Sequence, residues 1–206
     1  MNTQKNRKIA IFASGRGSNF SAIARAIKKG IVKADLALLV CDNPKAAVLQ
    51  KAKRAGVKSL LIKRKGFPSK EAFEQEIINN LKKEKIDLIV LAGFMRLLSP
   101  SFVQEFKHRI INIHPAILPS FKGEHGIQDA FGYGAKMTGI TVHFVDEEMD
   151  HGPIILQEAV KILENDTLET LEKKVHTIEH RLYPRAIQLY VEGKLKVTGR
   201  KVRIIS

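Results

Sequence analysis

Residues 8–20 read Lys8-Ile9-Ala10-Ile11-Phe12-Ala13-Ser14-Gly15-Arg16-Gly17-Ser18-Asn19-Phe20, an apolar run followed by a glycine-rich segment. An unbroken apolar run of this length is typical of a strand covered on both faces. From Phe20 onward, apolar residues recur at three- and four-residue steps, which predicts one face of a helix, and Gly30 predicts where that helix ends. The stretch therefore predicts a strand, a tight glycine loop and a helix in succession.

The strand-then-helix pattern repeats further along the chain. Strands are predicted over 35–40, 58–62 and 87–91, a helix over 46–55, and a second helix that begins after an N-cap at Ser69. Short, regular alternation of this kind is typical of parallel sheets. We therefore predict an α/β chain with a single doubly wound, mostly parallel sheet, helices on both faces and a Rossmann-like N-terminal half.

The second half predicts further strands and one long helix. Strands are predicted over 109–113, 139–145 and 154–160, with two short strand-like pieces in the tail 194–205. Asp166 with the acidic Glu169 three residues later is close to a capping box and predicts the start of the long helix. Pro184 predicts the end of this helix or a kink in it.

Length and composition are those of one globular domain of 206 residues. The longest apolar runs, such as 88–92, are far shorter than the ~20 residues of a membrane span. Residues 1–5 lack the apolar core of a signal peptide. The only cysteine, Cys41, excludes an internal disulfide, fits a reducing compartment and is predicted to pack at a strand end. We expect a cytoplasmic protein that does not bind membranes.

The net charge of +14 is concentrated in the N-terminal third. Residues 1–70 contain 17 Lys or Arg against only Asp35 and Asp42, whereas residues 71–206 are nearly balanced. Three interpretations stay open: nucleic-acid binding, attraction of small polyanionic ligands, and a basic surface with no specific partner. An aromatic content of 6% without tryptophan argues against a module that stacks nucleic-acid bases.

The glycine segment Gly15-Arg16-Gly17-Ser18-Asn19 predicts a phosphate site. Backbone N–H groups at a helix start bind anions, and glycines allow close approach. The alternative is a tight turn without a ligand. A dinucleotide site is disfavoured because Phe20 stands where the dinucleotide fingerprint has its third glycine.

A second group of polar residues predicts acyl-transfer chemistry. Asn112 and His114 lie in Ile111-Asn112-Ile113-His114-Pro115, and Asp150 follows 36 residues after His114. An amide and an imidazole can donate hydrogen bonds to a tetrahedral oxyanion, and a carboxylate can orient the imidazole and hold it charged.

Four segments together resemble the glycinamide ribonucleotide formyltransferase family: 13–20, 91–100, 112–119 and 141–157. They occur in the order and at the spacing of that family, and the resemblance extends over residues 8–195. It implies transfer of the formyl group of 10-formyltetrahydrofolate to the amine of glycinamide ribonucleotide, a step of de novo purine biosynthesis and one-carbon metabolism. It also implies a single formyltransferase domain over 1–206, with a nucleotide-phosphate half at about 8–100, a folate and catalytic half at about 101–195 and a short C-terminal tail.

The resemblance assigns roles to individual positions. Asn112, His114 and Asp150 match the catalytic trio, with His143 as a supporting donor. The substrate-binding positions are Gly17, Ser18 and Asn19 for the phosphate and Glu179 for the ribose end of the substrate. The folate-binding positions are Lys70, Met95, Arg96, Leu97, Leu98 and Asn112.

The route of the proton stays open among Asp150, His114 and an ordered water. The sequence also leaves open whether His125, on a loop expected to be flexible, binds substrate, and it gives His151 no role. No set of residues has convincing metal-ligand spacing, and this chemistry needs no metal.

Two enzymes of the same fold remain as alternatives, a formyltetrahydrofolate hydrolase and a tRNA-directed formyltransferase. The first usually carries an extra N-terminal regulatory domain, for which 206 residues leave no room. The second usually carries a further C-terminal RNA-binding domain and lacks the glycine loop at residues 15–19. We expect small-molecule substrates, no nucleic acid and a monomer or homodimer.

Overall fold

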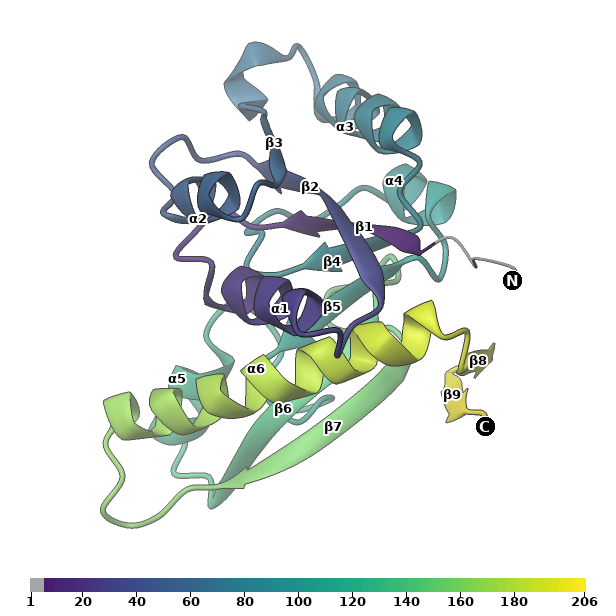
Figure 1. The fold of residues 1–206 in the computed structure, drawn as a ribbon. Coiled ribbons are helices and arrows are strands. Elements are labelled where there is room, and N and C mark those ends of the chain that lie inside the picture. The colour runs from purple at the N-terminus through teal and green to yellow at the C-terminus, as the bar shows by residue number, and fades with distance from the viewer. Residues whose placement is uncertain (1–5) are drawn as a thin grey trace. The chain divides into compact units, whose positions relative to one another are not determined.

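The computed structural model describes residues 6–206 and divides into two compact units, 1–111 and 112–206 (Figure 1). The predicted absence of a signal peptide concerned residues 1–5, which lie outside the described residues. The predicted halves divide near residue 100, whereas the compact units divide after Ile111. That the chain is one domain stays a prediction.

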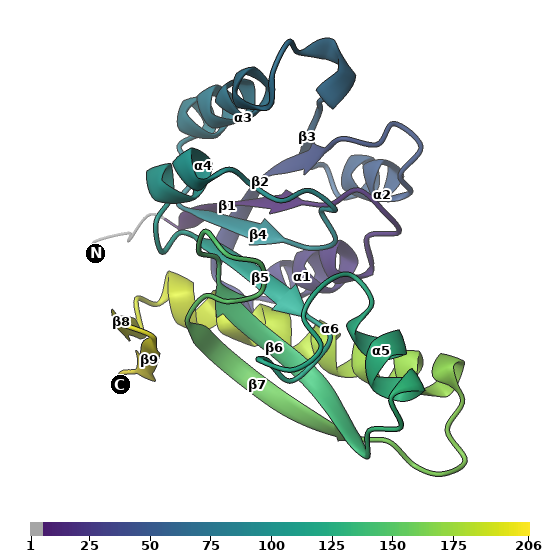
Figure 2. The same cartoon turned by 180° about the vertical axis from the view of Figure 1, so that it is seen from behind.

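The first unit is a parallel sheet with helices on both faces. Its strands are β1 (Arg7–Phe12), β2 (Ala34–Cys41), β3 (Lys58–Leu61) and β4 (Leu88–Leu91), in the order β3-β2-β1-β4. Each neighbouring pair is parallel. The helices are α1 (Ser18–Lys28), α2 (Val48–Arg54), α3 (Lys70–Glu84) and α4 (Pro100–Glu105), with a short 3-10 helix η1 (Arg64–Gly66). Figures 1 and 2 show α1 and α2 on one face and α3 and α4 on the other.

The apolar strands explain this arrangement. All four residues of β4 are buried, and the last four of β1 are completely so. A strand buried on both faces needs helices on both sides of the sheet. Phe12 at the end of β1 packs edge-on against Phe94 and Phe102, with ring centroids 5.2 and 6.3 Å away. Cys41 is buried with a free thiol, as predicted.

The second unit combines a mixed sheet with two helices. It begins within β5 (Ile110–His114) and contains β6 (Met137–Phe144), β7 (Ile154–Lys161), β8 (Leu195–Thr198) and β9 (Lys201–Ile204), in the order β5-β6-β7-β9-β8. β7 is antiparallel to β6 and parallel to β9, and the tail forms the antiparallel hairpin β8–β9. Helix α6 (Leu168–Val191) packs on β6 and β7, and α5 (Gly126–Gly132) packs on α6 and β6 (Figure 1).

The predicted α/β class with a mostly parallel sheet is confirmed, and the strands lie where the sequence placed them. Helices α4 and α5 were not predicted. Both are short, and α5 begins directly after His125, inside the segment expected to be a flexible loop.

The structure contradicts the predicted end of α6 at Pro184 and its predicted N-cap, whereas a kink at Pro184 stays a prediction. Pro184 neither ends nor interrupts the helix, which continues to Val191. Its neighbours Leu182, Tyr183, Ala186 and Ile187 are all buried. Burial of such side chains, at about 1.5–3 kcal/mol each for the larger ones, offsets the ~3 kcal/mol cost of an internal proline.

The N-cap of α6 is Thr167, not Asp166. The Thr167 side chain accepts from the backbone N–H of Thr170 at 3.2 Å, and the Thr167 N–H donates to Thr170 Oγ1 at 2.9 Å. Asp166 instead accepts from Leu163 N at 2.8 Å and binds Lys174 Nζ at 2.6 Å. The N-cap therefore lies one residue later than the sequence predicted. The capping box is formed by Thr167 with Thr170, three residues on, and not by Asp166 with Glu169.

This geometry predicts how the helix responds to substitution. Thr167→Ala should lower the free energy of unfolding by about 1 kcal/mol, because it leaves first-turn N–H groups without their acceptor. Glu169→Ala, the matched control on the same turn, should change it by less than about 0.5 kcal/mol, since Glu169 only forms an exposed pair with Lys173. Urea denaturation measures both. If Glu169→Ala lowered the free energy of unfolding more than Thr167→Ala does, the result would instead support the Asp166 cap predicted from the sequence.

Candidate active site

Strand β5 brings Asn112 and His114 to one face of the second unit's sheet. Side chains two residues apart on a strand point the same way. The flanking isoleucines Ile111 and Ile113 are buried and fix which face the polar pair takes. His114 is 3% exposed and Asn112 half-buried, so both lie in a site with little water.

Asp150 reaches this pair from the loop between β6 and β7. One carboxylate oxygen, Oδ2, accepts from Gly123 N at 2.9 Å and lies 3.3 Å from His114 Nδ1. The other, Oδ1, lies 3.4 Å from Asn112 Nδ2. The three residues that the sequence singled out are thus brought together around one carboxylate.

The backbone that carries Asp150 is strained. Asp150 has a φ of +48°, the left-handed region, which costs residues with a Cβ roughly 1–2 kcal/mol. Two residues later, a Cβ on Gly152 would stand 1.9 Å from the carbonyl oxygen of Phe144. Only glycine fits there, so the turn is held tightly against β6.

Each nitrogen of the His114 ring faces a hydrogen-bond acceptor. Its Nε2 lies 2.7 Å from the carbonyl oxygen of Phe121, and its Nδ1 faces Asp150 Oδ2. A carbonyl and a carboxylate only accept hydrogen bonds, so the ring satisfies both partners only when both nitrogens carry a hydrogen.

His143, on β6, completes the cluster. Its Nδ1 donates to the carbonyl oxygen of Phe144 at 2.7 Å. Its Nε2 lies 3.3 Å from Asn112 Nδ2 and 3.7 Å from Asp150 Oδ1. Nε2 accepts a hydrogen bond from Asn112 when it carries no hydrogen, and it donates one to Asp150 when it carries a hydrogen.

The pKa of Asp150 reflects this setting. Burial alone raises it, but the hydrogen bonds from His143 and Gly123 and the attraction of His114 outweigh burial and hold the pKa below its usual value of 3.8. The carboxylate is thus ionised near neutral pH, the form that can hold an imidazolium.

In the first unit, the glycine loop joins β1 to α1 as predicted. Gly17 is the N-cap of α1 with a φ of +69°, and a Cβ there would lie 2.6 Å from Val48 Cγ2. No side chain caps the first turn, which contains no acidic residue. Lys51 Nζ adds a positive charge 3.3 Å from the Gly17 carbonyl. Ser18 and Asn19 begin the helix, so this end favours an anion.

The predicted folate strip has mixed exposure. Met95 and Leu97 are 61% and 59% exposed, whereas Leu98 is buried. Arg96 is ion-paired with Asp42, which also accepts from the Ser14 hydroxyl beside the glycine loop. The structure therefore links the strip to the glycine loop through Asp42, for which the sequence did not predict this role.

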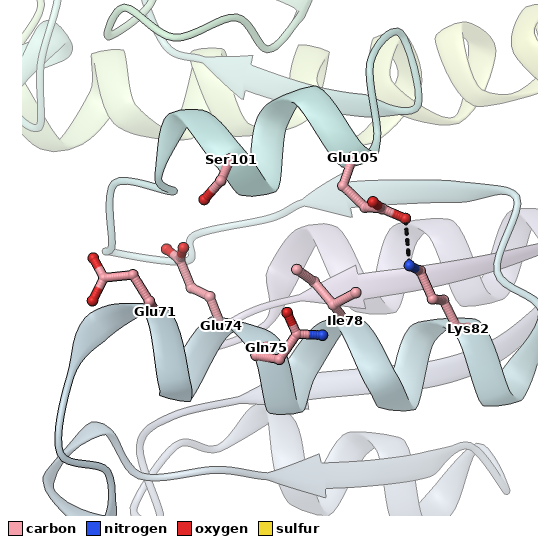
Figure 3. A pocket seen from close by; sticks show the side chains of 7 residues that line it. All are labelled: Glu71, Glu74, Gln75, Ile78, Lys82, Ser101 and Glu105. Carbon is pink, nitrogen blue, oxygen red and sulfur yellow. Dashed lines mark ion pairs between the residues drawn. The ribbon is translucent and has the colours of Figure 1, made fainter.

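Lys70 lies at the start of α3, 3.9 Å from the buried carboxylate of Glu74. Glu74 accepts from Ser99 N at 3.0 Å and from the Ser99 hydroxyl. It borders a pocket of about 200 Å³ between α3 and α4, whose wall also carries the Lys82–Glu105 ion pair (Figure 3). Since both Glu74 oxygens are satisfied by Ser99, this acid holds α4 against α3.

Glu179 lies on α6 and is 4% exposed. Its Oε2 lies 2.9 Å from His176 Nδ1, one helical turn earlier. A carboxylate this deeply buried requires a partner, and the i, i+3 histidine supplies one. The sequence predicted Glu179 but not its pairing with His176.

Among residues 6–206, no group of three or more His, Cys, Asp or Glu side chains is placed to hold a metal ion. No helix of the described chain is both long and apolar enough to cross a membrane.

Comparison with known proteins decides the family. The Formyl transferase family model matches residues 7–187. The chain belongs to the formyl transferase family. Membership identifies it as an enzyme of this type and confirms the resemblance inferred from the four segments.

Individual relatives agree with this assignment. The phosphoribosylglycinamide formyltransferase of Bacillus subtilis (strain 168) is 48% identical over 88% of this chain and 93% of its own length. The crystal structure of glycinamide ribonucleotide transformylase 1 from Symbiobacterium toebii superposes with a TM-score of 0.95 and 41% identity, covering 98% of this chain and 95% of that one. A formyltetrahydrofolate deformylase from Pseudomonas syringae pv. tomato str. DC3000, 24% identical, covers 98% of this chain and 67% of that one with a TM-score of 0.91, which shows a shared fold alone.

Sequence reasoning missed the two backbone groups of the site. Phe121 contributes its carbonyl and Gly123 its N–H, both from the loop after β5. Backbone groups have no side-chain signature. The only signal is a segment with glycine at 123 and 126, where a Cβ on Gly126 would lie 3.2 Å from His114 Nε2.

The lowered pKa of Asp150 predicts a pH-dependent contribution to stability. Because the folded pKa is depressed, the ionised carboxylate stabilises the fold above about pH 4, and this contribution is lost as pH falls through the folded value. Asp150→Asn should therefore be less stable than wild type at pH 7, and the two should converge as pH drops below 4. Urea unfolding across this range measures the difference. A constant difference at every pH would contradict the assignment of the charge to Asp150.

Proposed function

We propose that the chain transfers the formyl group of 10-formyltetrahydrofolate to the amine of glycinamide ribonucleotide, giving formylglycinamide ribonucleotide and tetrahydrofolate. The observation that carries the proposal is the cluster of Asn112, His114 and Asp150 around one ionised carboxylate. The names of the relatives from B. subtilis and S. toebii support the choice of substrate.

In the proposed reaction the substrate amine attacks the formyl carbon, and a tetrahedral oxyanion forms. Asn112 and the His114 imidazolium are the donors that stabilise it, each worth about 2.7–4 kcal/mol of barrier in comparable sites. The bond from the carbon to the folate nitrogen then breaks. The attacking nitrogen loses a proton and the folate nitrogen gains one, so protons balance.

One feature of the structure refines this mechanism. His114 Nε2 already donates to the Phe121 carbonyl, and its Nδ1 already faces Asp150. For Nε2–H to reach an oxyanion, the substrate oxygen must replace the Phe121 carbonyl as acceptor. Phe121 has a φ of +51°, in the left-handed region, so the residue that presents this carbonyl has a strained backbone.

The other groups are assigned by the same proposal. The glycine loop with Gly17, Ser18 and Asn19 binds the phosphate, and Glu179 binds the ribose end of the substrate. Lys70 and the strip of Met95, Arg96, Leu97 and Leu98 contact the folate. His143 supports the oxyanion donors through Asn112, 3.3 Å away. No step requires a metal.

The test is an absorbance assay of folate deformylation by purified protein, with and without glycinamide ribonucleotide. Deformylation that requires the nucleotide supports the transferase. Deformylation without it would instead indicate a hydrolase, and no turnover in either case would exclude both and direct the search to other formyl acceptors, such as charged initiator tRNA.

Asp150→Asn should fold but lose activity by about 10²-fold or more, because Asn cannot hold His114 as an imidazolium or carry a proton. Glu147→Gln is the matched control, since Glu147 lies in the same loop and is exposed. Its turnover should equal that of wild type. Near-normal turnover of Asp150→Asn would remove Asp150 from the mechanism.

A further inference from the structure

The C-terminal hairpin contacts the loop that carries Asp150. Its turn places Arg200 against His151, the residue directly after Asp150. Arg200 Nη2 donates to the backbone carbonyl oxygen of His151 at 2.6 Å. The hairpin is fixed in place because Lys201, the next residue, pairs with Ile154 of β7.

The second contact is to the His151 ring. A single guanidinium nitrogen, Nη1, lies 2.9 Å from Nε2 and 3.2 Å from Nδ1. A guanidinium only donates hydrogen bonds, so Nη1 donates to the ring, and Nε2 is its nearer acceptor. Arg200 thus binds the His151 ring and the His151 carbonyl through two different nitrogens, an arrangement that the single ammonium of a lysine cannot reproduce. The ring itself is oriented by Asp146, whose Oδ2 lies 2.8 Å from Nδ1.

These contacts act on a strained segment. Asp150 adopts its left-handed φ only because its neighbours hold it there. Gly152 is held against Phe144 on one side of His151, and Gly123 N holds the Asp150 carboxylate. Arg200 holds the peptide between these two anchors.

We infer that Arg200 is a positioning residue that holds the Asp150 loop in its reactive conformation through His151. The inference rests on the proposed function of the Asp150 site. It gives the C-terminal hairpin a role in turnover, although no residue of the hairpin is assigned to the reacting atoms.

The test compares Arg200→Ala with Arg203→Ala, an exposed arginine of the same hairpin, in the full-length protein. Arg200→Ala should lower kcat by about tenfold to a hundredfold with KM nearly unchanged, as expected when a reacting group is misplaced. Arg203→Ala should match wild type. Arg200→Lys, which keeps a donor for the His151 carbonyl but loses the separate donor to the His151 ring, should give a kcat between those of the two alanine variants.

A second readout does not depend on turnover. The ring ¹H–¹⁵N signals of His114, assigned with His114→Gln, should shift in Arg200→Ala and not in Arg203→Ala, because a displaced Asp150 changes the partner of Nδ1. The effects of Arg200→Ala and His151→Ala on kcat should be less than additive, since both remove the hydrogen bond between Arg200 and the His151 ring.

The outcomes separate the two proposals. Wild-type protein without formyl transfer contradicts the proposed function, whereas the His114 signals still test the positioning role. An active wild type with unchanged kcat and unchanged His114 signals in Arg200→Ala would overturn that role. An equal loss in Arg203→Ala would overturn it as well, because the hairpin would then act only through stability. If Arg200→Ala unfolds at a lower temperature than wild type, the Arg200→Lys variant decides by the same criteria.

Discussion

The site in the second unit depends on the contacts of the Asp150 carboxylate. This carboxylate contacts the His114 imidazole and the Asn112 amide of β5, and it accepts a hydrogen bond from the backbone N–H of Gly123 in the loop after β5. A partly buried carboxylate must be matched by donors, because an unpaired charge away from water is costly. That requirement brings together β5, the loop after β5 and the loop that carries Asp150. The ring of His114 then lies between two acceptors, the Phe121 carbonyl and the Asp150 carboxylate.

The same carboxylate lies on a backbone that local preferences do not favour. A left-handed Asp150 persists only because its surroundings hold it there, and the structure supplies contacts on both sides of it. Gly152 allows the loop to lie against β6, and Arg200 holds the intervening peptide. The backbone strain lies at Asp150 itself, the residue whose carboxylate must be held in a fixed orientation. This location agrees with a role of the surrounding contacts in positioning the carboxylate rather than in folding.

The fold alone does not select the reaction. A deformylase with 24% identity shares it nearly completely, so the difference between transfer and hydrolysis lies in the groups of the site and in what they bind. In this chain the glycine loop offers an uncapped helix start with a lysine nearby. The trio offers donors for an oxyanion. The Phe121 carbonyl accepts from His114 Nε2, and in the proposed mechanism a substrate oxygen replaces it there.

Local periodicity was sufficient to predict the strands, the larger helices and the α/β class, because a strand buried on both faces and a helix buried on one face leave different apolar patterns. The residue types of the trio indicated acyl transfer for the same local reason. Short helices such as α4 and α5 leave no such pattern. The continuation of α6 past Pro184 depends on burial that the chain acquires only on folding. The sequence by itself therefore determined the fold class, and it indicated the side chains that we propose carry the chemistry. Only the tertiary structure decided how they are used: that Phe121 and Gly123 contribute through backbone groups, that Glu179 pairs with His176 and that Arg200 reaches His151. Backbone hydrogen bonds and contacts between distant segments have no sequence pattern, since they arise from where the packed chain brings those segments together.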